Sequence, residues 1–292
     1  MPSTRDIRRR IKSVKNTAQI TKAMQMVAAA KMRKAQQSAL AGRPYAALMN
    51  DVLAAVTVNA GDFTHPLIET RDVKKVGVIL VSTDKGLCGA LNSNLMREAG
   101  KFDKNTTVYV CAGRKGSQFI ARTGRHLAAE FTYKDSPMFS EARAISKFAQ
   151  DLFLKGEVDR VDVLYTNFIS TLNQRSDVRP LLPVGEITSL SADVAGEGAA
   201  EALKGSGIEY LFEPAASQVF GALIPHYVNF QVYQFLLEAK ASEHSSRMVA
   251  MKNATDNAKQ LIKDMTLEYN KLRQTNITKE LLEITSAAMA MG

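Results

Sequence analysis

The sequence predicts an α/β protein in which two long terminal helices pair as an antiparallel coiled coil and flank a central open, Rossmann-like sheet domain. Three observations lead to this fold class. The last third of the chain repeats apolar residues at alternating steps of three and four, and the first 58 residues carry a similar stripe. Between them the pattern changes to short apolar runs separated by turns. We therefore expect a coiled-coil helix over 1–60, an α/β domain over 61–207 and a second coiled-coil helix over 208–292.

The C-terminal helix is the element around which the rest is organised. Its seam consists of Met248, Met251, Thr255, Ala258, Ile262, Met265, Tyr269 and Leu272, and resumes at Ile277, Leu281, Ile284 and Ala288. A period of 3.5 residues indicates a helix that supercoils around a partner. At 1.5 Å per residue, about 80 residues span roughly 120 Å, so we expect the helix to project from any core of this size. Pro225 should kink or locally break it.

The N-terminal helix is predicted over residues 3–58, with Ser3 or Thr4 as its cap. Its apolar stripe consists of Ile7, Ile11, Val14, Ala18, Thr21, Met24, Ala28, Met32, Ala35 and Ala39. Gly42-Arg43-Pro44 marks a candidate break or kink. If both helices leave the same side of the sheet domain, they lie antiparallel. Their seams then pack together, and the longer C-terminal helix extends beyond its partner as a bare tip.

The middle of the chain alternates strands with helices. Strands are predicted at Val76–Val81, Val108–Ala112 and Val161–Tyr165, with Leu127–Phe131 as a fourth, and helices near 90–101, 115–123 and 141–155. Alternating strands and helices favour βαβ units and an open α/β sheet. Residues 185–207 are predicted to form a loop, and Glu213-Pro214 to begin the last helix.

Composition restricts the class of protein. The chain has 292 residues, of which 46% are hydrophobic, enough to bury a core. Its longest apolar runs fall well short of the 18 or so residues needed to span a bilayer, and its first residues do not resemble a secretory signal. Cys88 and Cys111 have neither metal-ligand spacing nor a disulfide pattern, so reduced thiols in a cytosolic protein are the simple interpretation.

The net charge of +9 is concentrated at the N-terminus. Residues 1–43 contain eleven Lys and Arg residues against Asp6 alone, a local charge of +10. A basic helix indicates nucleic acid, an anionic membrane or an acidic protein surface as its partner. Aromatic residues are absent before Tyr45, so the segment offers no platform on which bases could stack. A basic nucleic-acid-binding coiled coil nevertheless remains the alternative function.

The turn from Ser82 to Asn92 follows a strand and is glycine-rich, a context that can place phosphate on a helix N-terminus. Its glycine spacing does not match the dinucleotide or P-loop motifs, however, which disfavours phosphate binding. Cys88 is better explained as a small buried residue than as a nucleophile. A small-ligand enzyme built on the sheet domain is a further alternative, and stoichiometric nucleotide binding would support it.

Three blocks of sequence resemble one known family. They are Ile7–Lys31, with IRRRIKSVKNT and ITKAMQMVAAAK; Asp84–Asn92, with DKGLCG; and Ser246–Ile284, which begins SRMVAMKNATDN. Together they resemble the gamma subunit of the F-type, proton-translocating ATP synthase, in its bacterial form. The inserted cysteine pair of the plant and green-algal form is not present.

The resemblance implies a rotor shaft, present as one copy per complex, with no cofactor, metal or catalytic residue of its own. Its coiled coil would lie inside a ring of alpha and beta subunits, and its sheet domain would contact the epsilon subunit and the membrane ring of c-subunits. Proton flow would turn the shaft, and ATP would be made or hydrolysed on beta. The implied location is the cytoplasmic face of the bacterial inner membrane, and nucleic acid is not an implied partner.

The resemblance also assigns positions for coupling between rotor and stator. They are Met24, Lys85, Arg247, Arg273, Gln274, Thr278, Glu280 and Glu283. Met24 matches the position where the shaft meets an acidic beta loop, and Lys85 matches a basic loop residue near beta. Arg247 and the polar residues after it match positions that contact the catch of beta. The identity of the coupling ion is set in the membrane ring and not in this chain.

Overall fold

A computed structural model describes residues 3–59, 65–184 and 215–291. The chain forms two compact units, one of residues 1–28 with 247–292 and the other of residues 29–246. We call them the paired-helix unit and the sheet unit. The boundaries predicted near residues 60 and 207, the loop over 185–207 and the helix start at Glu213-Pro214 all lie outside the described residues. They stay predictions.

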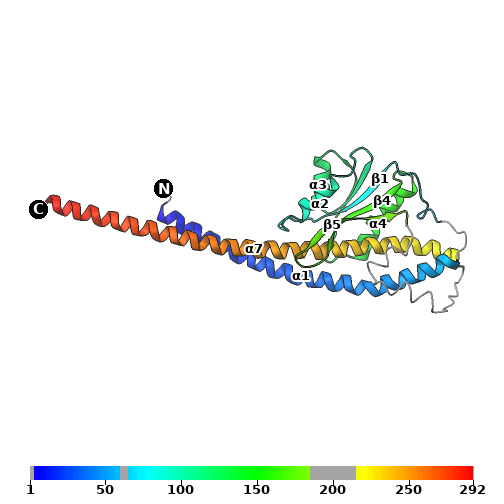
Figure 1. The fold of residues 1–292 in the computed structure, drawn as a ribbon, viewed down its shortest axis with the longest axis horizontal. Helices are drawn as coiled ribbons and strands as arrows, with labels where there is room; N and C mark the ends of the chain where they lie inside the picture. Colours follow the sequence, from blue (N-terminus) through cyan, green and yellow to red (C-terminus); the bar gives the residue numbers. More distant parts are fainter. Residues whose placement is uncertain (1–2, 60–64, 185–214, 292) are drawn as a thin grey trace. The chain divides into compact units, whose positions relative to one another are not determined.

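Two long helices run through both units. Helix α1 extends from Thr4 to Asn59 and helix α7 from Ala216 to Met291 (Figure 1). Each contains a proline, Pro44 in α1 and Pro225 in α7, yet neither helix is interrupted there. In the described residues, no helix is both long enough and apolar enough to cross a membrane.

A break at Gly42-Arg43-Pro44 or at Pro225 is therefore wrong, while the kink predicted as the alternative at each position stays a prediction. Tertiary packing explains why the helices continue past both prolines. A Cβ atom at Gly42 would lie 2.1 Å from Nε2 of Gln234, so the glycine permits close approach of α7. Near Pro225, Ile224 and Tyr227 are almost fully buried. Their burial offsets the backbone hydrogen bond that a proline removes.

The sheet has five strands in the order β3-β2-β1-β4-β5. They are β1 (Val76–Val81), β2 (Thr107–Ala112), β3 (His126–Phe131), β4 (Arg160–Phe168) and β5 (Gln174–Leu182). The four predicted strands are confirmed, and β1 to β4 pair in parallel. Strand β5 was not predicted. It pairs antiparallel with β4 at an edge, and its first seven residues, QRSDVRP, are exposed or half exposed, whereas Leu181 and Leu182 are buried.

Three helices complete the sheet unit: α2 (Leu91–Ala99), α3 (Arg114–Arg122) and α4 (Phe139–Leu154). One face of the sheet packs on α2 and α3 through Leu95 and Ile120. The other face packs on α4, and the same core continues into α1 and α7 through Leu53 and Leu236. This second face contains most of the buried apolar residues, so α7 is part of the core of the sheet unit.

The carboxyl ends of β1 and β2 approach each other very closely. Gly113, which follows β2, has a φ of 107°, and a Cβ atom there would lie 2.2 Å from the carbonyl oxygen of Ser82. Gly116 N–H donates to Ser82 Oγ at 2.8 Å. Lys115 N–H donates to the carbonyl of Thr83, and Arg114 N–H to Asp84. The first turn of α3 thus directs these backbone donors at the chain itself.

We expect Gly113→Ala to lower the free energy of unfolding by about 3 kcal/mol, because both the φ value and the clash with backbone disfavour a side chain. Urea unfolding can be followed by tyrosine fluorescence, since the chain has no tryptophan. Gly86→Ala is the matched control, because a Cβ atom there meets nothing within 4 Å. Equal stability of the two variants would contradict this account of the turn.

Candidate functional site

In the paired-helix unit, α1 and α7 pack antiparallel along the predicted seam (Figure 1). Thr21 of α1 and Thr255 of α7 share a hydrogen bond, with 2.7 Å between their Oγ1 atoms. The most buried members of the seam are Ile7 and Ala28 on α1, and Met251, Thr255, Ala258 and Met265 on α7. Small and flexible side chains at these positions let the two helices approach closely. The antiparallel pairing and the seam are therefore confirmed.

The last turns of α7 form an unpaired tail. Every residue from 273 to 290 is exposed, which confirms the predicted bare tip. Its apolar side chains are exposed as well, with Leu281 at 58%, Ile284 at 66% and Met289 at 84%. A run of exposed apolar residues on one helix marks a surface that another protein covers.

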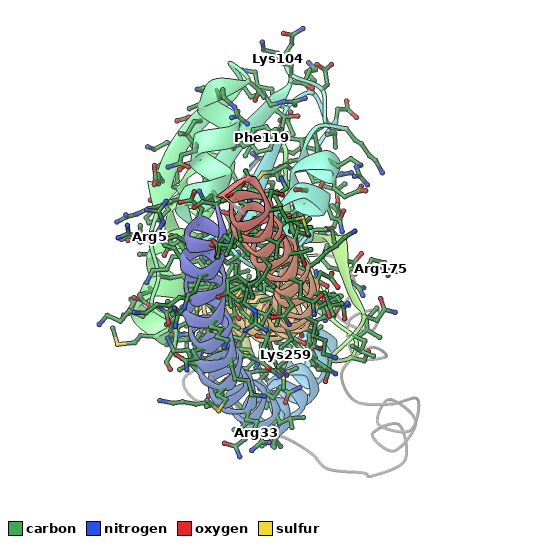
Figure 2. All side chains as sticks on the ribbon, turned by 90° about the vertical axis from the view of Figure 1, so that its left-hand side faces the viewer. Arg5, Arg33, Lys104, Phe119, Arg175 and Lys259 are labelled. Carbon is green, nitrogen blue, oxygen red and sulfur yellow. The ribbon has the colours of Figure 1, made fainter. Side chains whose placement is uncertain are left out.

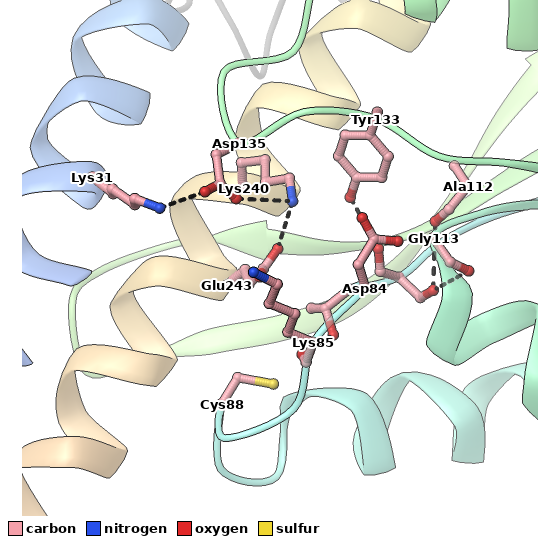
Figure 3. Close-up of polar contacts among 12 residues, drawn as sticks. Lys31, Asp84, Lys85, Cys88, Ala112, Gly113, Tyr133, Asp135, Lys240 and Glu243 are labelled. Carbon is pink, nitrogen blue, oxygen red and sulfur yellow. Dashed lines mark hydrogen bonds and ion pairs between the residues drawn. The ribbon is translucent and has the colours of Figure 1, made fainter. Parts of the chain in front are cut away.

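The predicted coupling residues occupy three separate places. The tail of α7 contains Arg273, Gln274, Thr278, Glu280 and Glu283, all exposed. Met24 on α1 and Arg247 on α7 are half-buried in the paired segment of the same unit. Lys85 belongs to the sheet unit, in the loop after β1, where it is exposed and points toward Glu243 (Figure 3). The structure thus gathers the tail residues on one helix end.

The basic residues of α1 face outward. All ten Lys and Arg side chains between residues 5 and 34 are exposed, and Figure 2 shows Arg5 and Arg33 extending away from the helix. Among them, Arg9 pairs with Asp6 at 3.0 Å and Lys31 pairs with Asp135. The exposed positive charge fits an acidic partner.

Sequence reasoning missed a cluster of charges in the sheet unit, which we call the α7 ion cluster: Lys31, Tyr133, Asp135, Lys240 and Glu243 (Figure 3). Lys240 Nζ lies 3.0 Å from Glu243 Oε2, 3.7 Å from Asp135 Oδ1 and 4.5 Å from the centre of the Tyr133 ring. Asp135 also accepts from Lys31 on α1. The cluster therefore joins α1, α7 and the loop after β3.

Burial differs sharply within the α7 ion cluster. The side chains of Lys240 and Glu243 are 2% and 4% exposed, whereas Asp135 is about half exposed. The hydrogen bond from Lys31 lowers the pKa of Asp135, with Lys240 adding to the effect. Burial, and then the nearby Glu243 carboxylate, raise the pKa of Tyr133 well above its usual range. Tyr133 therefore stays neutral, and its hydroxyl donates to the carbonyl of Ser82 at 3.0 Å.

Helix α7 also bonds directly to the end of β4 and the hairpin after it. Ser242 Oγ donates to the carbonyl of Thr166 at 2.9 Å, and Ser245 Oγ to that of Thr171 at 2.7 Å. Ser246 Oγ donates to Gln174 at 3.0 Å. Since ligands of open α/β sheets bind at the carboxyl ends of the strands, the chain's own helix occupies this position.

The sequence did hold a signal for this contact. The segment Ala239–Ser246, AKASEHSS, places small residues among polar ones, which is typical of a helix approached closely from several sides. Sequence reasoning did not single out Lys240 and Glu243, because a Lys and a Glu three residues apart on a helix usually form an exposed pair. Only the packing of the sheet against α7 shows that they are buried.

These features define the class of proteins in which two terminal helices pair as a coiled coil and an α/β domain is inserted between them in the sequence. The family model described as ATP synthase matches residues 3–291. The chain is 49% identical to the ATP synthase gamma chain of Opitutus terrae, with 99% of both chains covered, and 45% identical to that of Methylacidiphilum infernorum over both full lengths. The chain therefore belongs to the ATP synthase gamma chain family.

Solved structures share the fold. A chain of the Tetrahymena thermophila mitochondrial ATP synthase, from its central stalk and c-ring, is 26% identical, with a TM-score of 0.59 over 80% of this chain and 99% of that one. A chain from the Euglena gracilis mitochondrial ATP synthase gives a TM-score of 0.67 at 19% identity, covering 99% of this chain and 94% of that one. At that identity the second likeness concerns the fold alone.

We expect Asp135→Asn to destabilise the chain by about 1 kcal/mol at pH 7, the scale of a partly exposed ion pair. Because the pKa of Asp135 is lowered on folding, its contribution is present above the ordinary aspartate pKa of about 4 and is lost as pH falls through the lowered value. Urea unfolding of the variant and the wild type between pH 7 and pH 3 measures this difference.

The control is Asp72→Asn, at an exposed position of the same unit. It should leave stability within about 0.5 kcal/mol of wild type at every pH. If the stability difference between Asp135→Asn and the wild type stayed constant down to the lowest pH, the charge of the Asp135 carboxylate would not contribute to stability.

Proposed function

We propose that the chain is the central rotor shaft of an F-type ATP synthase, coupling proton flow through a membrane ring to ATP synthesis or hydrolysis on beta subunits. The strongest support for this proposal is the sequence similarity to ATP synthase gamma chains, which extends over 99–100% of both chains. The Tetrahymena neighbour is itself a chain of a central stalk and c-ring. The paired helices and the bare tail of α7 agree with the same role.

The shaft acts through its asymmetry. Where α1 and α7 are paired they share one seam, whereas from residue 273 to 290 α7 continues alone and exposed. Three beta subunits around such a shaft meet different surfaces of it at any moment. Each orientation therefore favours a different conformation at each beta site, and rotation changes which site is favoured.

The shaft is proposed to be non-catalytic. The place where an open α/β sheet usually binds its ligand holds Tyr133 and the buried end of Lys240. The backbone donors at the start of α3 are directed at Ser82, Thr83 and Asp84. The sheet unit thus serves as a rigid mount, and the bond chemistry takes place on beta.

The proposed partners follow from the two units. The paired-helix unit inserts among the alpha and beta subunits, where the exposed basic residues of α1 meet acidic surface of beta. The sheet unit contacts the epsilon subunit and the c-subunit ring. The complex, with one copy of this chain, lies on the cytoplasmic face of the bacterial inner membrane.

Coupling is proposed at the residues assigned by family resemblance. On the tail, Arg273, Gln274, Thr278, Glu280 and Glu283 offer exposed polar groups for transient contacts with the catch of beta. Met24 and Arg247 offer half-buried positions on the paired segment, and Lys85 a basic loop. An uncharged Met24 allows the shaft to slip past an acidic beta loop without forming an ion pair.

Reconstitution tests the proposed function. Purified chain mixed with alpha and beta subunits should form a stable complex with ATPase activity, whereas the chain alone should hydrolyse no ATP. A DNA mobility shift at physiological ionic strength is measured in parallel, because the nucleic-acid alternative requires a salt-dependent complex there. Failure to assemble, or hydrolysis by the isolated chain, would contradict the proposal.

We expect Met24→Lys to impair coupling. A lysine there would pair with the acidic beta loop and oppose slipping, so ATP-driven proton pumping per ATP hydrolysed should fall by about twofold to fivefold, the effect of one exposed ion pair. Met26→Lys adds the same charge at an exposed position two residues further along α1 and serves as the control. Unchanged coupling in Met24→Lys would remove this role for Met24.

A further inference from the structure

We propose that the α7 ion cluster, together with the serine contacts beside it, is the torsional anchor through which the sheet unit turns the two helices. The inference rests on the proposed function and assigns to Lys240 and Asp135 a positioning role in coupling. It concerns the contact within the sheet unit, through which torque from the membrane ring has to pass before it reaches the shaft.

Helix α7 is enclosed at this contact. Of the eleven residues from 235 to 245, ten are buried, and Glu238 is intermediate. A helix buried on all sides is normally apolar throughout. Here the buried set includes a lysine, a glutamate, a histidine and two serines: Lys240, Glu243, His244, Ser242 and Ser245. A core that only had to be stable would be simpler with apolar residues at these positions.

Hydrogen bonds and ion pairs are directional, so they can oppose rotation of α7 about its own axis. Apolar packing resists separation of α7 from the sheet, but it is non-directional and opposes rotation of the helix about its own axis only weakly. The bonds from Ser242 to Thr166 and from Ser245 to Thr171 hold one side of α7 at a fixed angle. Lys240 fixes another side through Asp135 and the Tyr133 ring, and its pair with Glu243 on the same helix holds the Lys240 side chain in place.

The cluster fixes α1 at the same place. Asp135 accepts from Lys31 of α1 and lies 3.7 Å from Lys240 of α7, so one carboxylate joins both helices to the loop after β3. Tyr133, two residues earlier, donates to the carbonyl of Ser82 at the end of β1. Turning the sheet relative to α7 would separate Lys240 from Asp135 and the Tyr133 ring, whereas Glu243 lies on the same helix and would move with it. Turning it relative to α1 would separate Asp135 from Lys31, and losing a partner of a buried charge is unfavourable.

An anchor of this kind should affect activity only when torque passes between the sheet unit and the two helices. We therefore compare two activities of the assembled complex: ATP hydrolysis by the detached head, where the sheet unit turns freely, and ATP synthesis in membrane vesicles, where the ring drives it. In Lys240→Met, which removes the charge but keeps an unbranched apolar chain, we expect ATP synthesis to fall about tenfold. Hydrolysis by the detached head should stay within about twofold of wild type.

Asp135→Asn and Asp135→Glu provide the second measurement. Because Asp135 is half exposed, both variants should fold, so the test does not depend on Lys240→Met alone. We expect Asp135→Asn to lower ATP synthesis and Asp135→Glu to restore it, since only the glutamate keeps the charge between Lys31 and Lys240. Lys101→Met, which breaks the exposed pair with Glu98 at 2.8 Å, is the matched control and should change neither activity.

Each outcome decides the proposal. Loss of synthesis alone, with rescue by Asp135→Glu, supports the anchor. An equal fall of both activities would mean that the cluster serves only folding or assembly, and no change in either would mean that apolar packing transmits the torque; both results overturn the proposal. If the wild-type chain itself failed to assemble with alpha and beta subunits, the proposed function would fail instead, which keeps the two cases distinct.

Discussion

The burial of a polar stretch of α7 at the carboxyl ends of the sheet strands is the constraint on which the rest of the sheet unit depends. Lys240 is 2% exposed, and Glu243, Asp135 and the Tyr133 ring surround its ammonium group, as a buried charge requires. Those partners fix the loop after β3 and, through Lys31, helix α1. The same contact occupies the place where other open α/β sheets bind a ligand.

The apolar residues of the two long helices are buried where the helices pair and exposed where α7 continues alone. Where they pair, Thr21 and Thr255 share a hydrogen bond within a seam of small and flexible apolar residues. Beyond the pairing, α7 exposes large apolar side chains such as Leu281 and Ile284, a residue type that folded proteins usually bury. An exposed apolar helix end is costly in water, and the proposed ring of beta subunits provides the surface that covers it.

Sequence reasoning reached the features that depend on local periodicity. The seam from Met248 to Leu272 and the strand Val76–Val81 could be predicted because each pattern reports burial directly. Strand β5 could not, because an edge strand with one solvated face mixes charges with apolar residues. Pro44 and Pro225 suggested breaks because local preference is all that a sequence shows, whereas packing between α1 and α7 keeps both helices continuous.

The α7 ion cluster was beyond such reasoning for another reason. Lys31, Asp135 and Lys240 are separated by more than 100 residues along the chain, and only the fold brings them together. The candidate coupling residues, in contrast, were identified from the family resemblance and not from a physical pattern. Met24, Lys85 and Arg247 carry no physical signal of their own in the sequence, and resemblance to the family singled them out.

The central claim is that this chain is a rotor whose paired-helix unit turns inside a ring of alpha and beta subunits. Its most direct measurement fixes alpha and beta subunits to a surface, attaches a visible bead to the sheet unit and supplies ATP. The account predicts stepwise rotation in one direction, with three resting positions matching the three beta sites. A bead that stays still, or moves at random while ATP is hydrolysed, would contradict it.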